Sequence, residues 1–162
     1  MFVDLLLDTG AYVVTVGESL ASGSFISPEM FECYVFPYQR EIAEAAHKRC
    51  GLLSTHICGN ITNMMSRVRK PVLISSSSTP ERTLMRLGRA TPGNTCLLGN
   101  VGMPDVLTFG KRDAVIEECR WRTEKVKPES DCILSSGCVI SPNAPAENLR
   151  ALVESARRGG QY

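Results

Sequence analysis

Residues 52–60 read LLSTHICGN, a short strand-like run followed at once by a Gly-Asn turn. The run Leu52–Cys58 predicts a buried strand that the turn ends. Comparable runs predict four more strands, over residues 12–16, 72–76, 95–99 and 132–136. Helical patterns fall between and around them, over residues 2–9, 28–48, 60–68, 79–88 and 112–126, and in a final helix with the stripe Leu149, Leu152, Val153 and Ala156. Strands that alternate with helices predict an α/β fold with parallel strands.

The helix over residues 28–48 carries the clearest start signal. Ser27 is placed as its N-cap and Pro28 as its first helical residue, and both residue types are favoured at those positions. Pro37 has no amide hydrogen to donate within the helix, so a bend is expected there.

Five such strands fit either an open doubly wound sheet or part of a (β/α)₈ barrel. Neither G-x-G-x-x-G nor G-x-x-x-x-G-K-[ST] occurs, so the dinucleotide-binding and phosphate-loop types of doubly wound sheet lack support. A complete barrel takes about 200 residues or more, and the chain has 162. The pattern alone therefore leaves the choice of fold open.

Composition predicts one globular domain over residues 1–162. Hydrophobic residues make up 43% and charged residues 22%, and the formal net charge is +1, which gives no reason to expect a nucleic-acid partner. No apolar run approaches the roughly 18 residues of a membrane span. The first residues, MFVDLLLDTG, make a poor signal peptide. We therefore expect a cytoplasmic location, where the seven cysteines would be reduced and available to a metal.

A metal-binding pattern lies at the end of the strand Leu52–Cys58. Residues i and i+2 of a strand point to the same side, so His56 and Cys58 would present an imidazole and a thiolate together. Cys138 follows the last predicted strand and offers a third ligand. One histidine and two cysteines suit catalytic zinc, because the fourth tetrahedral position stays open to a substrate. Spacing alone also allows the alternative of a core histidine and buried thiols.

Several segments, in the same order along the chain, resemble the uroporphyrinogen decarboxylase superfamily. They are GESLASGSFISPEMFECYVFPYQ (17–39), THICGN (55–60), LLGNV (97–101) and LSSGCVISPNAPAENLRALV (134–153). The superfamily fold is a (β/α)₈ barrel, so the resemblance implies that this chain is a partial barrel of about the last five βα units.

The resemblance favours the methylcobalamin:coenzyme M methyltransferase branch. Decarboxylases carry a histidine after the glycine of the last strand, where this chain has Gly137-Cys138. In the methyltransferases the zinc ligands map onto His56, Cys58 and Cys138, and Glu18 occupies a position where an aspartate is common. The resemblance thus makes Glu18 a candidate catalytic residue, as a fourth ligand or a carboxylate beside the ligands, with a solvated loop residue as the alternative. The branch implies zinc, and a methyl-corrinoid supplied by a partner carrier protein.

Three functions follow from these observations. The first is zinc-dependent methyl transfer from a methyl-corrinoid to a thiol such as coenzyme M. The second is a noncatalytic or truncated barrel fragment that serves as an assembly subunit. A decarboxylase is third, disfavoured by Cys138. Strands over residues 12–16 and 132–136 would be sheet edges with unpaired backbone groups, so we also expect a homo-oligomer or pairing with an amino-terminal barrel half.

Overall fold

The computed structural model describes residues 2–67, 72–76, 86, 95–125 and 131–159. The predicted helix that begins at Thr79 lies outside these residues, apart from Arg86. Within the described residues no helix is long and apolar enough to span a membrane.

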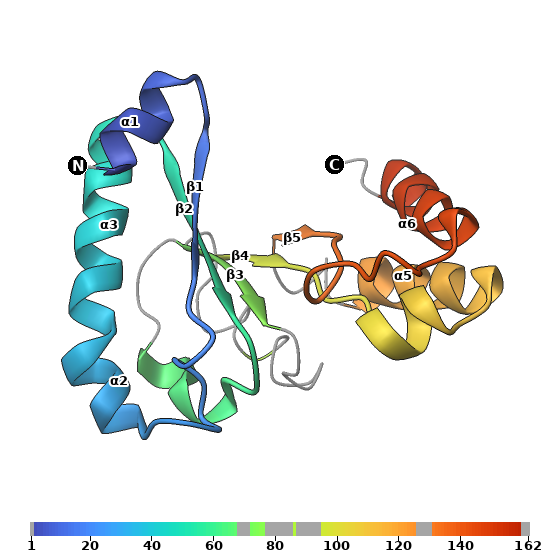
Figure 1. Ribbon diagram of the computed structural model, residues 1–162, viewed down its shortest axis with the longest axis horizontal. Coiled ribbons are helices and arrows are strands. Elements are labelled where there is room, and N and C mark those ends of the chain that lie inside the picture. Colours follow the sequence, from blue (N-terminus) through green and yellow to red (C-terminus); the bar gives the residue numbers. More distant parts are fainter. Residues whose placement is uncertain (1, 68–71, 77–85, 87–94, 126–130, 160–162) are drawn as a thin grey trace.

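The centre of the fold is a five-stranded sheet in which all neighbouring strands are parallel. The strands are β1 (Val13–Gly17), β2 (Leu52–Ile57), β3 (Val72–Ser76), β4 (Thr95–Leu98) and β5 (Cys132–Ile133). They lie side by side in chain order, β1-β2-β3-β4-β5 (Figure 1). A doubly wound sheet reverses its strand order at a switch point. The described strands of this sheet follow chain order without a reversal, as consecutive βα units of a barrel do.

The first helices cover one side of β1 and β2. They are α1 (Phe2–Asp8), α2 (Pro28–Tyr34) and α3 (Phe36–Lys48). Ser27 caps α2 as predicted, its hydroxyl accepting a hydrogen bond from the amide of Met30 at 3.2 Å. The prediction of one bent helix over residues 28–48 is wrong. The helix is interrupted at Val35, and Pro37 lies in the first turn of α3. Amide hydrogens in the first turn of a helix have no carbonyl partner within it, so the proline removes no helical hydrogen bond there.

The later helices form a second group, at the right of Figure 1. They are the π-helix η2 (Met103–Thr108), α5 (Arg112–Lys125) and α6 (Ala146–Gly159), whereas the 3₁₀ helix η1 (Thr62–Arg67) lies at the lower left of the figure, near α2. The buried residues of α6 are Asn148, Ala151 and Leu152, and Val153 is 49% exposed. The predicted stripe is therefore rotated: buried Asn148 donates to the carbonyls of Leu107 and Gly110, which turns the helix toward η2.

Three hydrophobic clusters of described residues hold the helices to the sheet and to each other, and the smallest joins α1, β1 and α3 through Val3, Val14 and Ala46. One lies between the sheet and its helices and contains Phe31, Ile57, Ile61, Met64, Leu97 and Ala21. Another joins α5, α6 and η2 through Val101, Leu107, Val115, Cys119, Ala151 and Leu152. Burial of this kind stabilises a fold by roughly 25 cal/mol for each Å² of apolar surface removed from water.

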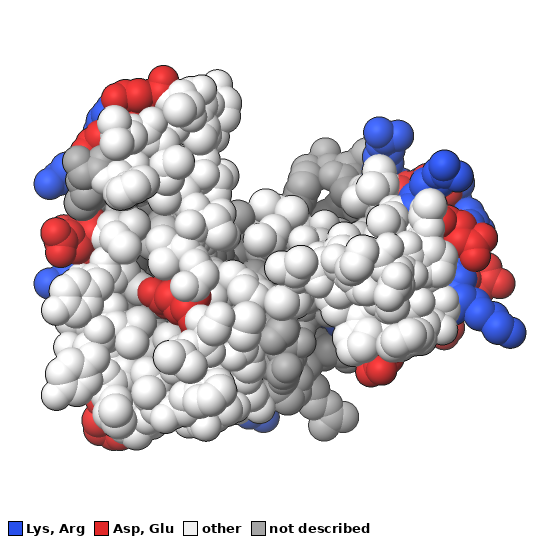
Figure 2. Space-filling model, in the orientation of Figure 1, with Lys and Arg blue, Asp and Glu red and all other residues white. Residues whose placement is uncertain are grey.

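Among the residues that the structure describes, part of the opposite face of the sheet is exposed. Val13 and Leu52 are register partners on β1 and β2, and Ile133 pairs with Leu98 at the other end of the sheet. Their exposed fractions are 41%, 48% and 45%. In Figure 2 most charged side chains on the visible face lie near its left and right margins, and the area between them carries few charges. The molecule thus presents apolar side chains on a sheet face that a complete barrel would enclose.

Candidate metal centre

His56 and Cys58 are placed by the end of β2. His56 pairs in register with Gly17 of β1, and Cys58 follows the last residue of the strand. The next residue, Gly59, has φ of 128°, a conformation that other residues rarely adopt. A Cβ at Gly59 would lie 2.6 Å from the Ser22 hydroxyl oxygen, so the turn also brings the loop after β1 against the end of β2.

Cys138 reaches the same place from the loop after β5. Ser136 forms an isolated parallel bridge with Val101, which extends the pairing of β4 and β5. The Gly137 amide then donates to the Val101 carbonyl at 2.9 Å, and the Ser136 hydroxyl donates to the Cys138 carbonyl at 2.8 Å. These contacts hold the loop immediately before and at Cys138.

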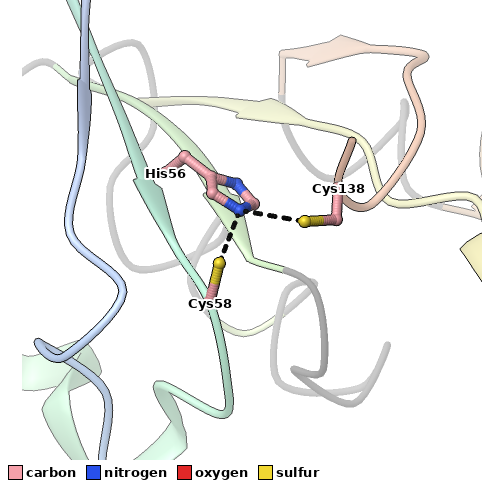
Figure 3. A group of neighbouring side chains, drawn as sticks. All are labelled: His56, Cys58 and Cys138. Atoms are coloured by element: carbon pink, nitrogen blue, oxygen red, sulfur yellow. Dashed lines mark hydrogen bonds between the residues drawn. The ribbon is translucent and has the colours of Figure 1, made fainter. Parts of the chain in front are cut away.

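The three side chains converge on one point (Figure 3). His56 Nε2 lies 3.1 Å from Cys58 Sγ and 3.6 Å from Cys138 Sγ, and all three atoms are within 4.8 Å of one another. In tetrahedral zinc sites, with bonds of about 2.0–2.1 Å to nitrogen and 2.3 Å to sulfur, the N–S and S–S separations are about 3.5 Å and 3.8 Å. The cluster is close to those dimensions, and its nitrogen and sulfur donors are the ones zinc prefers. The arrangement fits a zinc ion bound by three protein ligands.

Ser19 is part of this site and the sequence did not indicate it. Its hydroxyl donates to Cys58 Sγ at 3.8 Å. The preceding residue, Glu18, donates its backbone amide to the His56 carbonyl at 2.8 Å, which fixes the loop after β1 beside β2. A hydroxyl donor to a ligating sulfur stabilises the thiolate form. Only the tertiary contact between β1 and β2 creates this interaction.

The Glu18 side chain turns toward helix α3. It is half-buried, its carboxylate accepts a hydrogen bond from the Gln39 amide, and it does not belong to the group of three ligand atoms. Burial raises the pKa of the Glu18 carboxyl above its usual value, and the Gln39 hydrogen bond opposes that shift. Glu18 is thus neither a simple solvated residue nor one of the three clustered ligands, and its role in metal binding stays a prediction.

A groove of about 550 Å³ adjoins Ser19 and Glu18. Its lining is mostly apolar and comes from the loop after β1 and from α2, with Leu20, Ala21, Ile26, Met30, Tyr34 and Val35. Glu18 is the one ionisable carboxylate in that lining. The groove gives an apolar ligand a surface next to the residue that contacts Cys58.

A buried arginine also lies behind the site. A charged residue in the helix predicted over residues 112–126 is expected at the surface, yet Arg122 is 4% exposed and contacts Asn100. Helical periodicity contained the signal, because Val115, Cys119 and Arg122 are the buried residues of α5 and are spaced at i, i+4 and i+7.

Comparison with known proteins identifies relatives over nearly the whole chain. The model of the family uroporphyrinogen decarboxylase (URO-D) matches residues 1–159. The chain is 28% identical over 156 residues to the methylcobamide:CoM methyltransferase MtbA of Methanosarcina acetivorans, covering 96% of this chain and 44% of that protein. It is 26% identical over 154 residues to the methylcobamide:CoM methyltransferase MtaA of Methanosarcina barkeri, covering 94% of this chain and 43% of that protein.

A solved structure, a methyltransferase from Methanosarcina mazei, superposes with a TM-score of 0.79 at 23% identity. The match covers 99% of this chain and 46% of that one, and it supports the fold. The chain spans less than half the length of the curated relatives it matches.

Proposed function

Because the chain belongs to the uroporphyrinogen decarboxylase family, we propose that it supplies the zinc-binding part of a methyltransferase that moves a methyl group from a methyl-corrinoid to a thiol. Its curated relatives include methylcobamide:CoM methyltransferases, so coenzyme M is the acceptor we propose first. The corrinoid would come on a partner carrier protein.

The observation that carries this proposal is the convergence of His56, Cys58 and Cys138. Their ligand atoms lie within 4.8 Å of one another although Cys138 is 82 residues from His56 in the chain. They lie at the carboxyl end of β2 and in the loop after β5, and the carboxyl ends of parallel strands are where α/β folds assemble active sites.

Each residue has a defined part in the proposed site. His56, Cys58 and Cys138 would hold the zinc, and Ser19 would stabilise the Cys58 thiolate through its hydroxyl. Zinc at such a site lowers the pKa of an incoming thiol, so that the acceptor binds as a thiolate at neutral pH. In the proposed transfer the acceptor sulfur would take the methyl group, and the corrinoid would keep the electron pair of the broken cobalt–carbon bond. Glu18 remains a proposed carboxylate of the site.

We also propose that residues 1–162 form one domain, comprising about the last five βα units of a barrel. The exposed part of the sheet face supports this, because Val13, Leu52 and Ile133 expose apolar side chains that an amino-terminal barrel half or a second copy would bury. A fragment that acts only in such an assembly, without catalysis of its own, is the second candidate. A cytoplasmic location fits the cysteines: all seven lie in the described residues and none forms a disulfide.

Native mass spectrometry of the purified chain, read together with metal content, tests the proposal. We expect one zinc per chain and a dimer or larger assembly. X-ray absorption should then give one nitrogen at about 2.0–2.1 Å and two sulfurs at about 2.3 Å. Methyl transfer from methylcobalamin to coenzyme M by the zinc-loaded protein would complete the case. A folded monomer whose zinc shell is absent or made of oxygen alone would contradict both the metal centre and the assembly.

A further inference from the structure

A charged network is buried behind the loop that carries Cys138. Arg122 on α5 is 4% exposed and donates from Nη1 to Asn100 Oδ1 at 2.6 Å and from Nη2 to Glu118 Oε1 at 2.5 Å. Glu118 lies one turn earlier on the same helix, and Asn100 directly follows the turn after β4. The guanidinium thus joins α5 to the carboxyl end of β4.

Asn100 in turn contacts the cysteine-bearing loop. The next residue, Val101, accepts the Gly137 amide hydrogen bond at 2.9 Å and forms the bridge to Ser136. A Cβ placed on Gly137 would lie 3.5 Å from the Asn100 Cβ, so Gly137 packs directly against Asn100. Cys138 follows Gly137. Three contacts therefore separate Arg122 from a proposed metal ligand: Arg122 with Asn100, Asn100 with Gly137, and the peptide bond to Cys138.

The position of Cys138 depends on these contacts because β5 is short. The strand contains two residues, Cys132 and Ile133, and the ladder to β4 stops there apart from the single bridge at Ser136. By contrast, His56 lies in a six-residue strand that is paired on both sides, and Cys58 directly follows that strand. Of the three clustered side chains, Cys138 has the least support from the sheet itself.

Stability alone does not account for the network. A buried guanidinium loses its hydration, and replacing a buried ion pair by apolar residues of similar volume often leaves a protein equally or more stable. We propose that Arg122 and Asn100 are a positioning pair that sets where Cys138 presents its thiol to His56. This inference rests on the metal centre proposed above.

Two measurements on the purified 162-residue chain test it, one of them without metal. In cobalt(II)-loaded protein, the thiolate-to-metal absorption reports how many cysteines bind, and chelator competition reports the affinity. In metal-free protein, the rate of Cys58–Cys138 disulfide formation with diamide, followed by peptide mass spectrometry, reports how close the two thiols lie. The variant Arg122→Met keeps an unbranched side chain and removes the charge and the donors. We expect metal affinity to fall about 10–100-fold, cobalt absorption to approach that of one thiolate, and cross-linking to slow.

The matched control is Arg112→Met, the same change at an exposed ion pair of α5 with Glu154. It should leave both readouts at wild-type values. At position 100, Asn100→Ala should behave like Arg122→Met, and Asn100→Asp, which keeps an oxygen for the guanidinium, should recover most of the wild-type values. If Arg122→Met does not fold, the two Asn100 variants carry the comparison, since both keep Arg122 paired with Glu118.

The outcomes separate the two ideas. A variant with a lower melting temperature but unchanged cobalt absorption, affinity and cross-linking would overturn the positioning role and leave the metal centre standing. Wild-type protein that binds no cobalt or zinc would overturn the proposed function. In that case, cross-linking that does not respond to Arg122→Met would overturn the positioning role as well.

Discussion

Replacing Cys138 by alanine should weaken zinc binding about 100–1,000-fold. Zinc in small proteins with four ligands contributes about 10–16 kcal/mol of binding free energy, or about 3–4 kcal/mol for each ligand. Affinity changes tenfold for each 1.4 kcal/mol or so, which gives about 2–3 orders of magnitude for one ligand. The 3.6 Å separation of Cys138 Sγ and His56 Nε2 matches a shared tetrahedral ion, so Cys138 is assigned a full ligand's share.

Competition with a chromophoric chelator measures the affinity, and X-ray absorption should show the sulfur count dropping from two to one. Cys33→Ala and Cys119→Ala serve as controls, because Cys33 is an exposed residue of α2 and Cys119 is buried between α5 and α6. Both should retain wild-type affinity and two sulfurs. If Cys138→Ala bound zinc as tightly as the wild type, or if Cys119→Ala alone lost it, the reasoning from these three side chains would be refuted.

The other predictions concern the groups around the ligands. If Glu18 ligates or orients the metal, Glu18→Gln should weaken zinc retention by about 10–100-fold, measured by dialysis against a chelator; unchanged retention would leave it only as the partner of Gln39. Ser19→Ala removes the hydroxyl from Cys58 Sγ and should lower affinity about fivefold, for a net hydrogen-bond contribution of about 1 kcal/mol; a variant with wild-type affinity would show that the contact does not support the thiolate. Zinc affinity should fall as pH drops, because protons compete for the histidine and thiolate ligands. Affinity that stays constant from about pH 8 to about pH 5, the range in which histidine usually titrates, would count against this donor set.

The strands were predictable because each has a local signature. The predicted strand Leu52–Cys58 is observed as Leu52–Ile57, and the one predicted over residues 12–16 is observed as Val13–Gly17. An apolar run closed by a glycine turn leaves little freedom about where a strand ends. The strand predicted over residues 132–136 is observed only at Cys132–Ile133, because its length depends on how far β4 continues beside it.

The predictions for the helices were wrong where tertiary contacts outweigh the local sequence pattern. Pro37 was expected to bend one helix, but a proline is equally suited to begin a second one, and the chain does so after Val35. In α6 the polar residue Asn148 is buried and Val153 is exposed, since Asn148 satisfies the carbonyls at the end of η2. Neither outcome can be read from hydrophobic periodicity.

In the candidate site, too, some residues could be predicted from the local sequence and others could not. His56 and Cys58 fall two residues apart at the end of one predicted strand, so their proximity follows from the sequence by alternation. Cys138 was proposed because it follows the last predicted strand, the resemblance favoured the same residue, and the structure places its sulfur near the other two ligand atoms. Ser19 and Arg122 act across contacts between different elements; periodicity could have indicated that Arg122 is buried, but the partners of both residues come only from tertiary structure.

The separation of the ligands along the chain has a consequence for the unfolded state. Cys138 lies 82 residues from His56, so an ion held by both is a cross-link that closes a long loop. For a covalent cross-link of that span, the entropy removed from the unfolded chain corresponds to about 4–5 kcal/mol at 25 °C. Closure of the shorter His56–Cys58 pair removes almost none, since those residues are already neighbours. The loop-closure part of the ion's contribution to stability would thus come through Cys138, the ligand that ties the segment before the last helix to the first part of the sheet.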